Sequence, residues 1–421
     1  MAKALSPGRT KKLMKKTRTY FYWALVFWAL VATYGLIVRY HLWHPLPIDY
    51  MNWLNAHSHA AFLGWLHAGF MIFLTYTFMP AFLTEHKAFG RLFVFMQLLV
   101  AGMLVSFPLQ GYKAASITLL SLFLLATYVW AYWFLRRNEK KKDYPLAFSL
   151  ARAAVWMMIL SSLSPWMLGP VMVFLGKDSI WYNLDVYFYL HFQYNGWFFL
   201  ALLSLGVYLL EKQGLLQVDE REIKKITFIL VTAVLLGYIT NTLWTRPPLY
   251  FNFLALLSVA LEAWGLWLIW RRIRPYGRAL YDSRLQKELL ILIAAGLAGK
   301  VIFQFMASCP YFSHLAYTIR DFIIGYLHWV FLGTYSVFLL YWMEKEKIFR
   351  LDRRAFRMFF AGYLWMIVFI FLRGTLVWLK IIAPEGLPAW IFWATTLMYT
   401  GILWIMYDAH RQLYGNKNSA S

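Results

Sequence analysis

The stretch LNAHSHAAFLGWLHAGF (residues 54–70) places His57, His59 and His67 inside a segment that is otherwise apolar enough to enter a lipid bilayer. A hydrocarbon core of about 30 Å is spanned by roughly 20 apolar residues in a helix, and residues 53–78 form such a run. Only helices and closed barrels satisfy every backbone amide in hydrocarbon. The chain is therefore predicted to be all-α, a polytopic membrane helix bundle with about 12 transmembrane helices. The other runs are 20–40, 90–110, 114–135, 148–175, 186–210, 226–244, 250–270, 287–306, 322–343, 355–379 and 388–407.

The composition agrees with a membrane protein. Hydrophobic residues make up 61% of the 421 residues, and the mean hydropathy is +0.54, whereas soluble chains are about 45–50% apolar. The single cysteine, Cys309, excludes an internal disulfide, a paired-thiolate metal site and a C-x-x-C-H attachment for covalent haem. The fifth run contains SSLSPWMLGP (161–170), a Ser/Pro/Gly stretch that predicts a kink or a close helix contact.

The charge distribution predicts the orientation in the membrane. Lys and Arg number 41 against 19 Asp and Glu, giving a net charge of +22. This excess would suggest nucleic acid in a soluble protein, but here it is concentrated in the N-terminal tail and in alternate loops. By the positive-inside rule both termini are expected in the cytoplasm. The basic loops then face anionic membrane lipid, and nucleic acid is not an expected partner. The basic clusters lie within 11–18, 136–142, 224–225, 271–278 and 350–354.

No long polar domain or low-complexity tract interrupts the runs. We therefore expect a single transmembrane domain over residues 1–421, with a basic cytoplasmic tail at 1–19 and a second cytoplasmic tail at 411–421. The basic N-terminus leads into a full-length apolar run without a small-residue cleavage site, which predicts a retained first helix. The expected location is the inner (cytoplasmic) membrane of a bacterial-type cell, as a multi-pass protein.

Three histidines share one predicted depth. His57, His191 and His328 each follow the start of an even-numbered run by roughly five to seven residues, or about 8–10 Å at 1.5 Å per residue. Neutral imidazole is the commonest biological metal ligand, and a buried polar ring in lipid is costly unless something satisfies it. If their helices are neighbours, these rings could converge on a haem or a metal. The alternative is that each ring only hydrogen-bonds an adjacent helix.

The remaining histidines of the opening stretch point elsewhere. His57 and His59 are 200° apart around a regular helix, so they face different neighbours and cannot bind the same iron. One interpretation makes His59 a partner of His191 in a residual metal site, while His67 hydrogen-bonds within the bundle. His314 is too far along the chain from His328 to share its site and is assigned to an outer loop.

The residues around the three matched positions resemble motifs of the haem-copper oxidase superfamily. HSHAA (57–61) resembles the H-T-N-A motif of helix 2, which makes His57 an axial ligand of a low-spin b-type haem. IGYLHWVFLG (324–333) resembles the helix-10 motif I-G-H-V-H-S-G-A-L-G, which makes His328 the opposite ligand. YLHFQYNGWFFLALLSLGVY (189–208) is similar to helix 6 of the superfamily and implies a copper-type role for His191.

The chain also departs from the superfamily pattern. Tyr326 stands where the family has the histidine that holds the high-spin haem, and phenolate is an uncommon haem ligand. The seventh run ends LLGYITNTLWTRPP (235–248), without the two adjacent copper-binding histidines of the family. His191 alone does not make a three-histidine copper site. The resemblance therefore implies a remote branch, comparable to NnrS-type membrane haem proteins, with a second haem or copper near His191 and Tyr326 as a further expectation.

Charged residues near these positions have two interpretations each. Arg246, Arg320 and Arg373 are predicted near the outer side, where a guanidinium suits a haem propionate; the alternative is that they are solvated. Glu262 and Lys300 fall near mid-membrane on consecutive runs. Intramembrane charges tend to pair and often mark proton paths, so the pair is either a structural ion pair or an element of a proton relay.

The sequence leaves several functions open. The first is redox chemistry on oxygen or nitric oxide by an oxidoreductase of the respiratory electron-transport type, with a quinol or a small redox protein as partner. The second is a haem-binding membrane protein without turnover, acting in nitric oxide response, haem handling or oxidase assembly. The third is a cofactor-free, proton-coupled transporter that uses the histidines, Glu262 and Lys300.

Overall fold

The computed structural model describes residues 6–137 and 141–415, and all regular elements within these ranges are helices. Twelve of its helical segments are long and apolar enough to cross a membrane. Each contains most of one predicted run, so the all-α polytopic bundle is confirmed. The segments are Pro7–Trp43, Tyr50–Phe78, Ala88–Gln110, Ala114–Arg136, Pro145–Phe174, Ile180–Glu211, Glu220–Thr245, Tyr250–Leu280, Arg284–Ala307, Arg320–Lys345, Arg353–Trp378 and Leu387–Tyr414.

The chain forms two compact units, which we describe separately. The central unit is Leu135–Val330, and the terminal unit consists of Lys3–Phe134 and Phe331–Ser421. The single domain expected over residues 1–421 stays a prediction.

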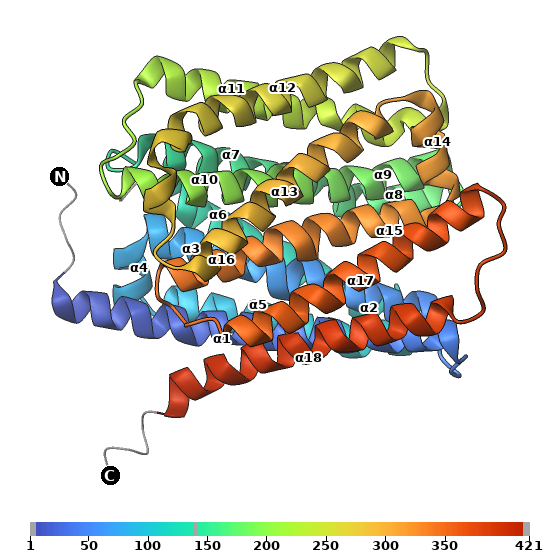
Figure 1. Cartoon of the computed structure of the whole chain (residues 1–421), viewed down its shortest axis with the longest axis horizontal. Helices are drawn as coiled ribbons and strands as arrows, with labels where there is room; N and C mark the ends of the chain where they lie inside the picture. Colours follow the sequence, from blue (N-terminus) through green and yellow to red (C-terminus); the bar gives the residue numbers. More distant parts are fainter. Residues whose placement is uncertain (1–5, 138–140, 416–421) are drawn as a thin grey trace. The chain divides into compact units, whose positions relative to one another are not determined.

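The terminal unit is organised around its first helix. Helix α1 contacts α2 and α18, α2 contacts α5, and α17 runs beside α18 (Figure 1). Trp28 of α1 stacks on Trp65 with ring centroids 4.7 Å apart, and both side chains are almost fully buried. The elements are α1 (Pro7–Trp43), α2 (Tyr50–Ala60), η1 (Ala61–His67), α3 (Ala68–Phe78), α4 (Pro80–Glu85), α5 (Ala88–Gln110), α6 (Ala114–Arg136), α16 (Val337–Lys345), α17 (Arg353–Trp378) and α18 (Leu387–Tyr414).

The structure describes part of each predicted tail. Helix α1 begins at Pro7, so the described part of the 1–19 tail continues the helix of the first span rather than preceding it. Pro at the first helical position and the following run of good helix formers favour this early start. Helix α18 extends to Tyr414, which makes the beginning of the 411–421 tail helical as well. Residues 416–421 lie outside the described residues.

The central unit contains the spans that carry His191 and His328. Helix α7 contacts α10 and α11, while α12 contacts α11 and α13. The α-helix of the fifth span is interrupted in the predicted Ser/Pro/Gly stretch, because α7 ends at Ser161 and α8 begins at Leu163. The elements are α7 (Pro145–Ser161), α8 (Leu163–Phe174), α9 (Ile180–His191), η2 (Phe192–Phe198), α10 (Phe199–Glu211), α11 (Glu220–Gly237), η3 (Tyr238–Thr245), α12 (Tyr250–Ile273), η4 (Arg274–Leu280), α13 (Arg284–Ala307), α14 (Pro310–Thr318) and α15 (Arg320–His328), followed by η5 (Trp329–Ser336), which leads into α16.

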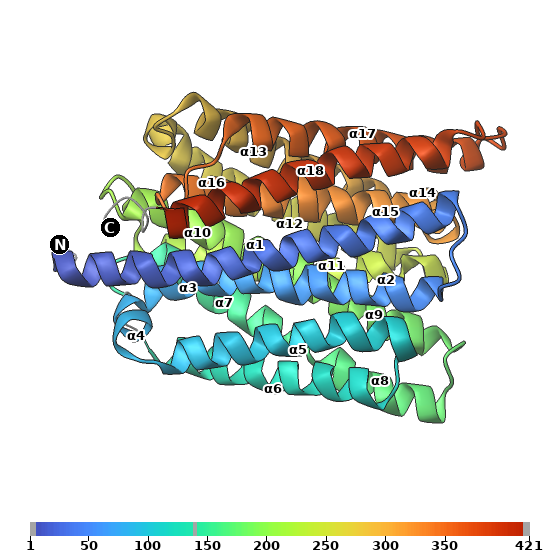
Figure 2. The ribbon, with the colours of Figure 1, turned by 90° about the horizontal axis from the view of Figure 1, so that it is seen from below.

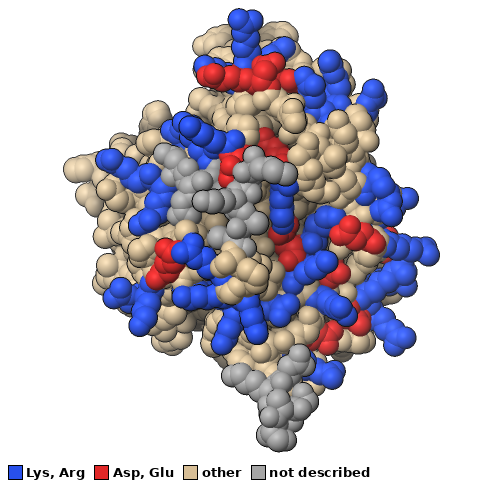
Figure 3. Space-filling model, turned by 90° about the vertical axis from the view of Figure 1, so that its left-hand side faces the viewer, with Lys and Arg blue, Asp and Glu red and all other residues tan. Residues whose placement is uncertain are grey.

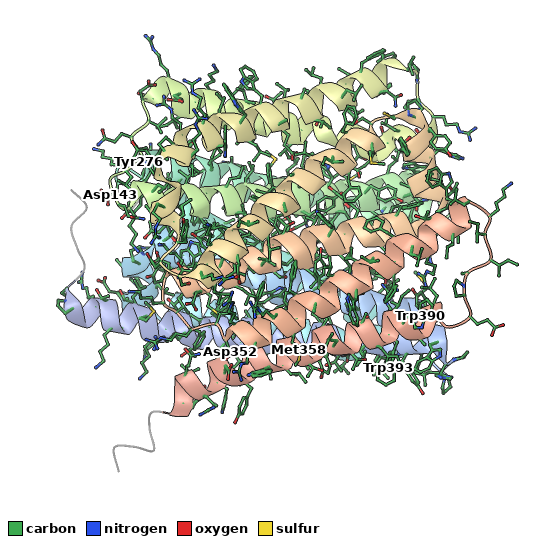
Figure 4. The ribbon with its side chains drawn as sticks, viewed as in Figure 1. Asp143, Tyr276, Asp352, Met358, Trp390 and Trp393 are labelled. Atoms are coloured by element: carbon green, nitrogen blue, oxygen red, sulfur yellow. The ribbon has the colours of Figure 1, made fainter. Side chains whose placement is uncertain are left out.

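The helix ends carry charged and aromatic side chains. The face in Figure 3 exposes many Lys and Arg with fewer Asp and Glu. In the terminal unit, Lys16 Nζ donates to Leu83 O at 2.9 Å, and Figure 2 shows α4 close to α1 at this end. Figure 4 shows Asp352 at one end of the α17–α18 hairpin and the half-exposed Trp390 and Trp393 toward the other end. Exposed tryptophans at helix ends are typical of a membrane–water interface.

Candidate functional site

Among the described residues, three spans contain a π-helical segment that begins one or two residues after a candidate histidine. Segment η1 lies in the second span, η2 in the sixth and η5 in the tenth. A π-helix inserts an extra residue into a turn, is rare, and is found frequently at functional sites. The segment η2 begins one residue after His191, and η5 begins one residue after His328. The structure therefore marks the same three spans that the predicted histidine depths had singled out.

The π segments share a sequence pattern that sequence analysis missed. Each contains or follows a histidine with an aromatic residue three positions later and a glycine five positions later: HAAFLG (59–64), HFQYNG (191–196) and HWVFLG (328–333). The copies lie roughly a third of the chain apart. This recurrence was a detectable signal, and it aligns His59, rather than His57, with His191 and His328.

The three glycines let a neighbouring helix approach the π segment closely. A Cβ on Gly64 would lie 2.9 Å from Phe27 Cδ1 of α1, and a Cβ on Gly196 would lie 2.6 Å from Met157 Cβ of α7. In the terminal unit, a Cβ on Gly333 would collide with the hydroxyl of a tyrosine on α17. Small residues at helix contacts are the usual device for close packing in membranes. The pattern thus fixes each π segment against one adjacent helix.

His57 is held in one defined tautomer by α1. Its Nδ1 lies 2.9 Å from Val31 O, and because a carbonyl can only accept, Nδ1 carries the hydrogen. In the neutral ring the lone pair is then on Nε2. The ring lies against Gly35, where a Cβ would be 2.8 Å from His57 Cε1. Glycine at this position is therefore required for the ring to reach Val31.

His328 has the same tautomer, reached through its own helix. Its Nδ1 lies 2.7 Å from Ile324 O, one turn earlier in α15, so Nδ1 again donates and Nε2 carries the lone pair. The next residue, Trp329, donates from Nε1 to Gly296 O of α13 at 3.0 Å. Donation of one ring N–H to a carbonyl is the arrangement that orients most metal-binding histidines.

Both ring nitrogens of His191 form hydrogen bonds. Its Nε2 donates to Val234 O at 2.7 Å, which leaves the lone pair on Nδ1. The Nδ2 amides of Asn195 and Asn241 lie 3.1 Å and 3.0 Å from Nδ1 and donate to it. The side chain is 1% exposed. A metal at His191 would have to replace these two amide donors at Nδ1.

His59 and His67 contact residues of the terminal unit. His59 Nε2 lies 2.6 Å from the Tyr112 hydroxyl. His67 is buried, with its ring centroid 5.4 Å from that of Phe123 and 6.5 Å from that of Trp130. Within the described residues, no group of three or more His, Cys, Asp or Glu side chains is arranged to hold a metal ion.

Tyr326 lies among aromatic rings of the central unit. Its ring centroid is 5.9 Å from that of Tyr194 and 5.9 Å from that of Phe303. Tyr194 also contacts His191, with centroids 6.5 Å apart. The Tyr194 ring therefore contacts both Tyr326 and His191, so these three side chains lie close together.

Two of the three predicted propionate partners lie near α14. Arg246, which ends η3 in the left-handed region at φ 57°, donates from Nη2 to His314 Nε2 at 3.3 Å. Arg320 begins α15, and both arginines are exposed. His314 lies on the short helix α14, within the connection between the ninth and tenth spans. Nearby, the buried Trp244 Nε1 has no hydrogen-bond partner among the described residues.

The third predicted partner is in the other unit. Arg373 is partly buried, one turn before the end of α17 at Trp378. A basic side chain inside a span is expensive unless it reaches an acceptor or the interface. Its place near the helix end is consistent with a haem-propionate partner and also with a solvated side chain.

Glu262 and Lys300 form a buried ion pair in the central unit. Lys300 Nζ lies 2.6 Å from Glu262 Oε1, and the side chains are 0% and 3% exposed. Lys300 Nζ also donates to Gln304 Oε1 at 3.3 Å and lies 4.3 Å from the centre of the Phe199 ring. The predicted pairing of these two charges is therefore present.

No family model matches the chain, and no curated protein matches it.

Proposed function

We propose that the chain is a b-type haem protein of the inner (cytoplasmic) membrane, in which His57 and His328 supply the axial nitrogens. The observation that carries the proposal is the tautomer these two histidines share. Each donates Nδ1–H to a backbone carbonyl and so carries its lone pair on Nε2.

The donor set suits haem iron. Neutral imidazole from two spanning helices is the usual axial pair of a low-spin b-type haem, and the hydrogen bond at Nδ1 fixes ring orientation and raises ligand basicity. The single Cys309 offers no covalent attachment, so the haem would be held noncovalently. When bound, the haem would supply one-electron chemistry.

Polar groups near α14 suit the propionates. Arg246 and Arg320 are exposed cations, and Trp244 Nε1 is a buried donor that lacks an acceptor among the described residues. A guanidinium binds a carboxylate bidentately, and an indole N–H can add a third hydrogen bond. Arg373 is the corresponding candidate in the terminal unit.

The expectation also includes a second centre. A further haem or copper near His191, Tyr326 and His59 would support redox chemistry on oxygen or nitric oxide, with a quinol as electron donor. The bonds at both nitrogens of His191 favour instead a haem-binding protein without turnover. The buried Glu262–Lys300 pair favours the third function, a proton-coupled transporter.

The topology is also part of the proposal. The basic helix ends support a cytoplasmic location for both termini, with anionic lipid headgroups as partners.

A reduced-minus-oxidised absorption spectrum of the purified protein tests the proposal. We expect a low-spin haem band that is lost in His57→Ala and in His328→Ala. The band should persist in His59→Ala and in the control His410→Ala, whose Nδ1 meets a tyrosine hydroxyl at an exposed position. Loss of the band in His59→Ala but not in His57→Ala would move the ligand to the residue that the repeated pattern aligns.

The same samples separate the alternatives. A carbon monoxide-sensitive high-spin signal together with the low-spin band would support an enzyme, and the low-spin band alone would support a binding protein. Copper content measured in the wild type and in His191→Ala tests the second centre. Wild-type protein without any haem band, purified from cells supplied with haem, would refute both haem functions and leave the transporter.

A further inference from the structure

The Glu262–Lys300 pair has no evident stabilising purpose. Removing two charges from water costs several kcal/mol per ion even after relaxation, and an apolar pair of similar volume is often equally stable or more stable. In a membrane span this cost is not offset by nearby solvent. The pair is nevertheless almost completely buried, with its charged atoms 2.6 Å apart.

Lys300 is the first residue of a stripe of polar side chains on α13, and the stripe continues from it toward α14. Lys300, Gln304 and Ser308 are spaced four residues apart, so they lie on one face of the helix. Lys300 Nζ donates to Gln304 Oε1, and Ser308 Oγ donates to Gln304 O at 2.9 Å. Asn252, near the start of α12, donates from Nδ2 to Ser308 O at 2.8 Å. These polar groups extend from the pair to the α14 end of the central unit.

The stripe stops at the pair. The next position on the same face of α13 toward the opposite end is Gly296, whose carbonyl accepts from an indole N–H. One turn from Glu262 in that direction, α12 has Gly265, against which a leucine of α11 lies. Polar side chains therefore continue from the pair in one direction only, toward α14. In the opposite direction the corresponding positions are occupied by small and apolar residues.

Few other ionisable groups face the pair. Helix α10 contributes Phe199, whose ring lies under the ammonium group. Tyr194 of η2 lies within electrostatic range of Glu262, and His191 at the end of α9 lies within range of Lys300. Among the described residues, the ammonium group donates hydrogen bonds to Glu262 and Gln304. A proton that reaches the pair can therefore be accepted only by the Glu262 carboxylate, because the Lys300 ammonium group has no lone pair.

We propose that the Glu262–Lys300 pair is a proton-binding site of the membrane interior, reached from the α14 end of the central unit past Gln304. A hydronium ion gives one proton to a carboxylate oxygen of Glu262 and becomes water, which converts the carboxylate to the carboxylic acid. Release to water reverses the step and restores the ion pair. No electron is transferred, and the site does not depend on the proposed haem.

Infrared difference spectroscopy of the full-length protein in lipid nanodiscs tests this site. On acidification, we expect a carboxylic-acid C=O band that is absent in Glu262→Gln. The matched control is Glu211→Gln, which alters another buried carboxylate of the same unit, one that accepts from the backbone amides of Leu146 and Ala147. A band that persists in Glu262→Gln, or one that is lost only in Glu211→Gln, would overturn the proposal.

The access route has a separate readout. Transfer from H₂O to D₂O shifts the carboxylic-acid band, and its rate reports proton access. We expect Gln304→Leu to slow this shift by about tenfold, the factor that corresponds to roughly 1.4 kcal/mol in a barrier. An unchanged rate would refute access past Gln304.

A double variant distinguishes loss of the proton site from loss of the folded structure. Glu262→Gln leaves Lys300 buried without its charged partner, which can destabilise the protein. Glu262→Gln/Lys300→Met removes both charges at similar volume and should fold. It must lack the acid band if the site is correct, and retention of the band in this folded variant would assign the band to another carboxyl group. The infrared measurements do not depend on haem binding. A negative result for the proton site can therefore be distinguished from a negative result for the proposed haem function.

Discussion

The contact between α17 and α18 depends on two reciprocal glycines, and replacing them should destabilise the protein measurably. A Cβ on Gly362 would lie 2.7 Å from Met398 Cα, and a Cβ on Gly401 would lie 2.6 Å from Phe359 Cα. Ordinary carbon contacts are about 3.5–4.0 Å. Because the obstructing atoms are backbone, no side-chain rotation relieves the overlap, and the helices must separate.

The expected cost follows from this overlap. Separation by about 1 Å is an overpacking defect that costs about 1–3 kcal/mol. Gly362→Ala and Gly401→Ala are each expected to fall in this range. The double variant should cost less than the sum, because helices already moved apart by one methyl accommodate the second.

Equilibrium unfolding in mixtures of mild detergent and sodium dodecyl sulfate, followed by tryptophan fluorescence, measures these free energies. The control is Gly206→Ala in α10, a helical glycine with no atom within 4 Å of the added Cβ. It should be neutral or more stable by about 0.5–1 kcal/mol, the usual gain from replacing a helical glycine. If the α17 and α18 variants are as stable as this control, the close approach of the two backbones is refuted.

Three further substitutions test individual interactions, with the change in unfolding free energy as the common measurement. Ser336→Ala removes the acceptor 2.8 Å from the buried Trp65 Nε1, which should cost about 1–3 kcal/mol; a loss below 0.5 kcal/mol would mean that the indole finds another acceptor. Glu211→Ala leaves two amides of the first turn of α7 without their acceptor, and should cost about 1–3 kcal/mol for each, whereas Glu211→Gln retains one oxygen and should cost less; equal losses would contradict this role. Arg272→Ala breaks an ion pair with Glu222 at a helix end, where screening limits the loss to about 1 kcal/mol, and the loss should shrink as salt is raised; a larger, salt-independent loss would refute a screened surface pair.

The membrane spans could be predicted from sequence because insertion into the bilayer depends on the summed hydropathy of a segment. Burying a backbone in hydrocarbon needs roughly 20 apolar residues whatever their order, so a window average locates each run. The ends were less predictable. Helix α1 starts at Pro7 because local helix formers continue the helix into the basic tail, and a hydropathy window excludes such residues.

The candidate site was only partly predictable. The Glu262–Lys300 pairing followed from the cost of isolated charges in lipid, and the structure contains this pair. The shared depth of His57, His191 and His328 in the membrane, counted along regular helices, stays a prediction. The tautomers did not follow, because they depend on which carbonyl lies beside each ring. The hydrogen bond of Asn241 to His191 required the contact between α9 and η3 to be known.

The π segments change the helical phase of the spans that contain them. An uninterrupted α-helix turns by about 100° per residue, so one inserted residue rotates everything after it by that angle relative to everything before it. Deleting one residue from η2 would allow regular α-helix throughout the sixth span, but with α10 held in place it would swing His191 about 100° away from its amide partners. In these spans, the side chains at the two ends are set in register by a single extra residue, which explains how one apolar helix can present its histidine and its close-packed glycine to different neighbours.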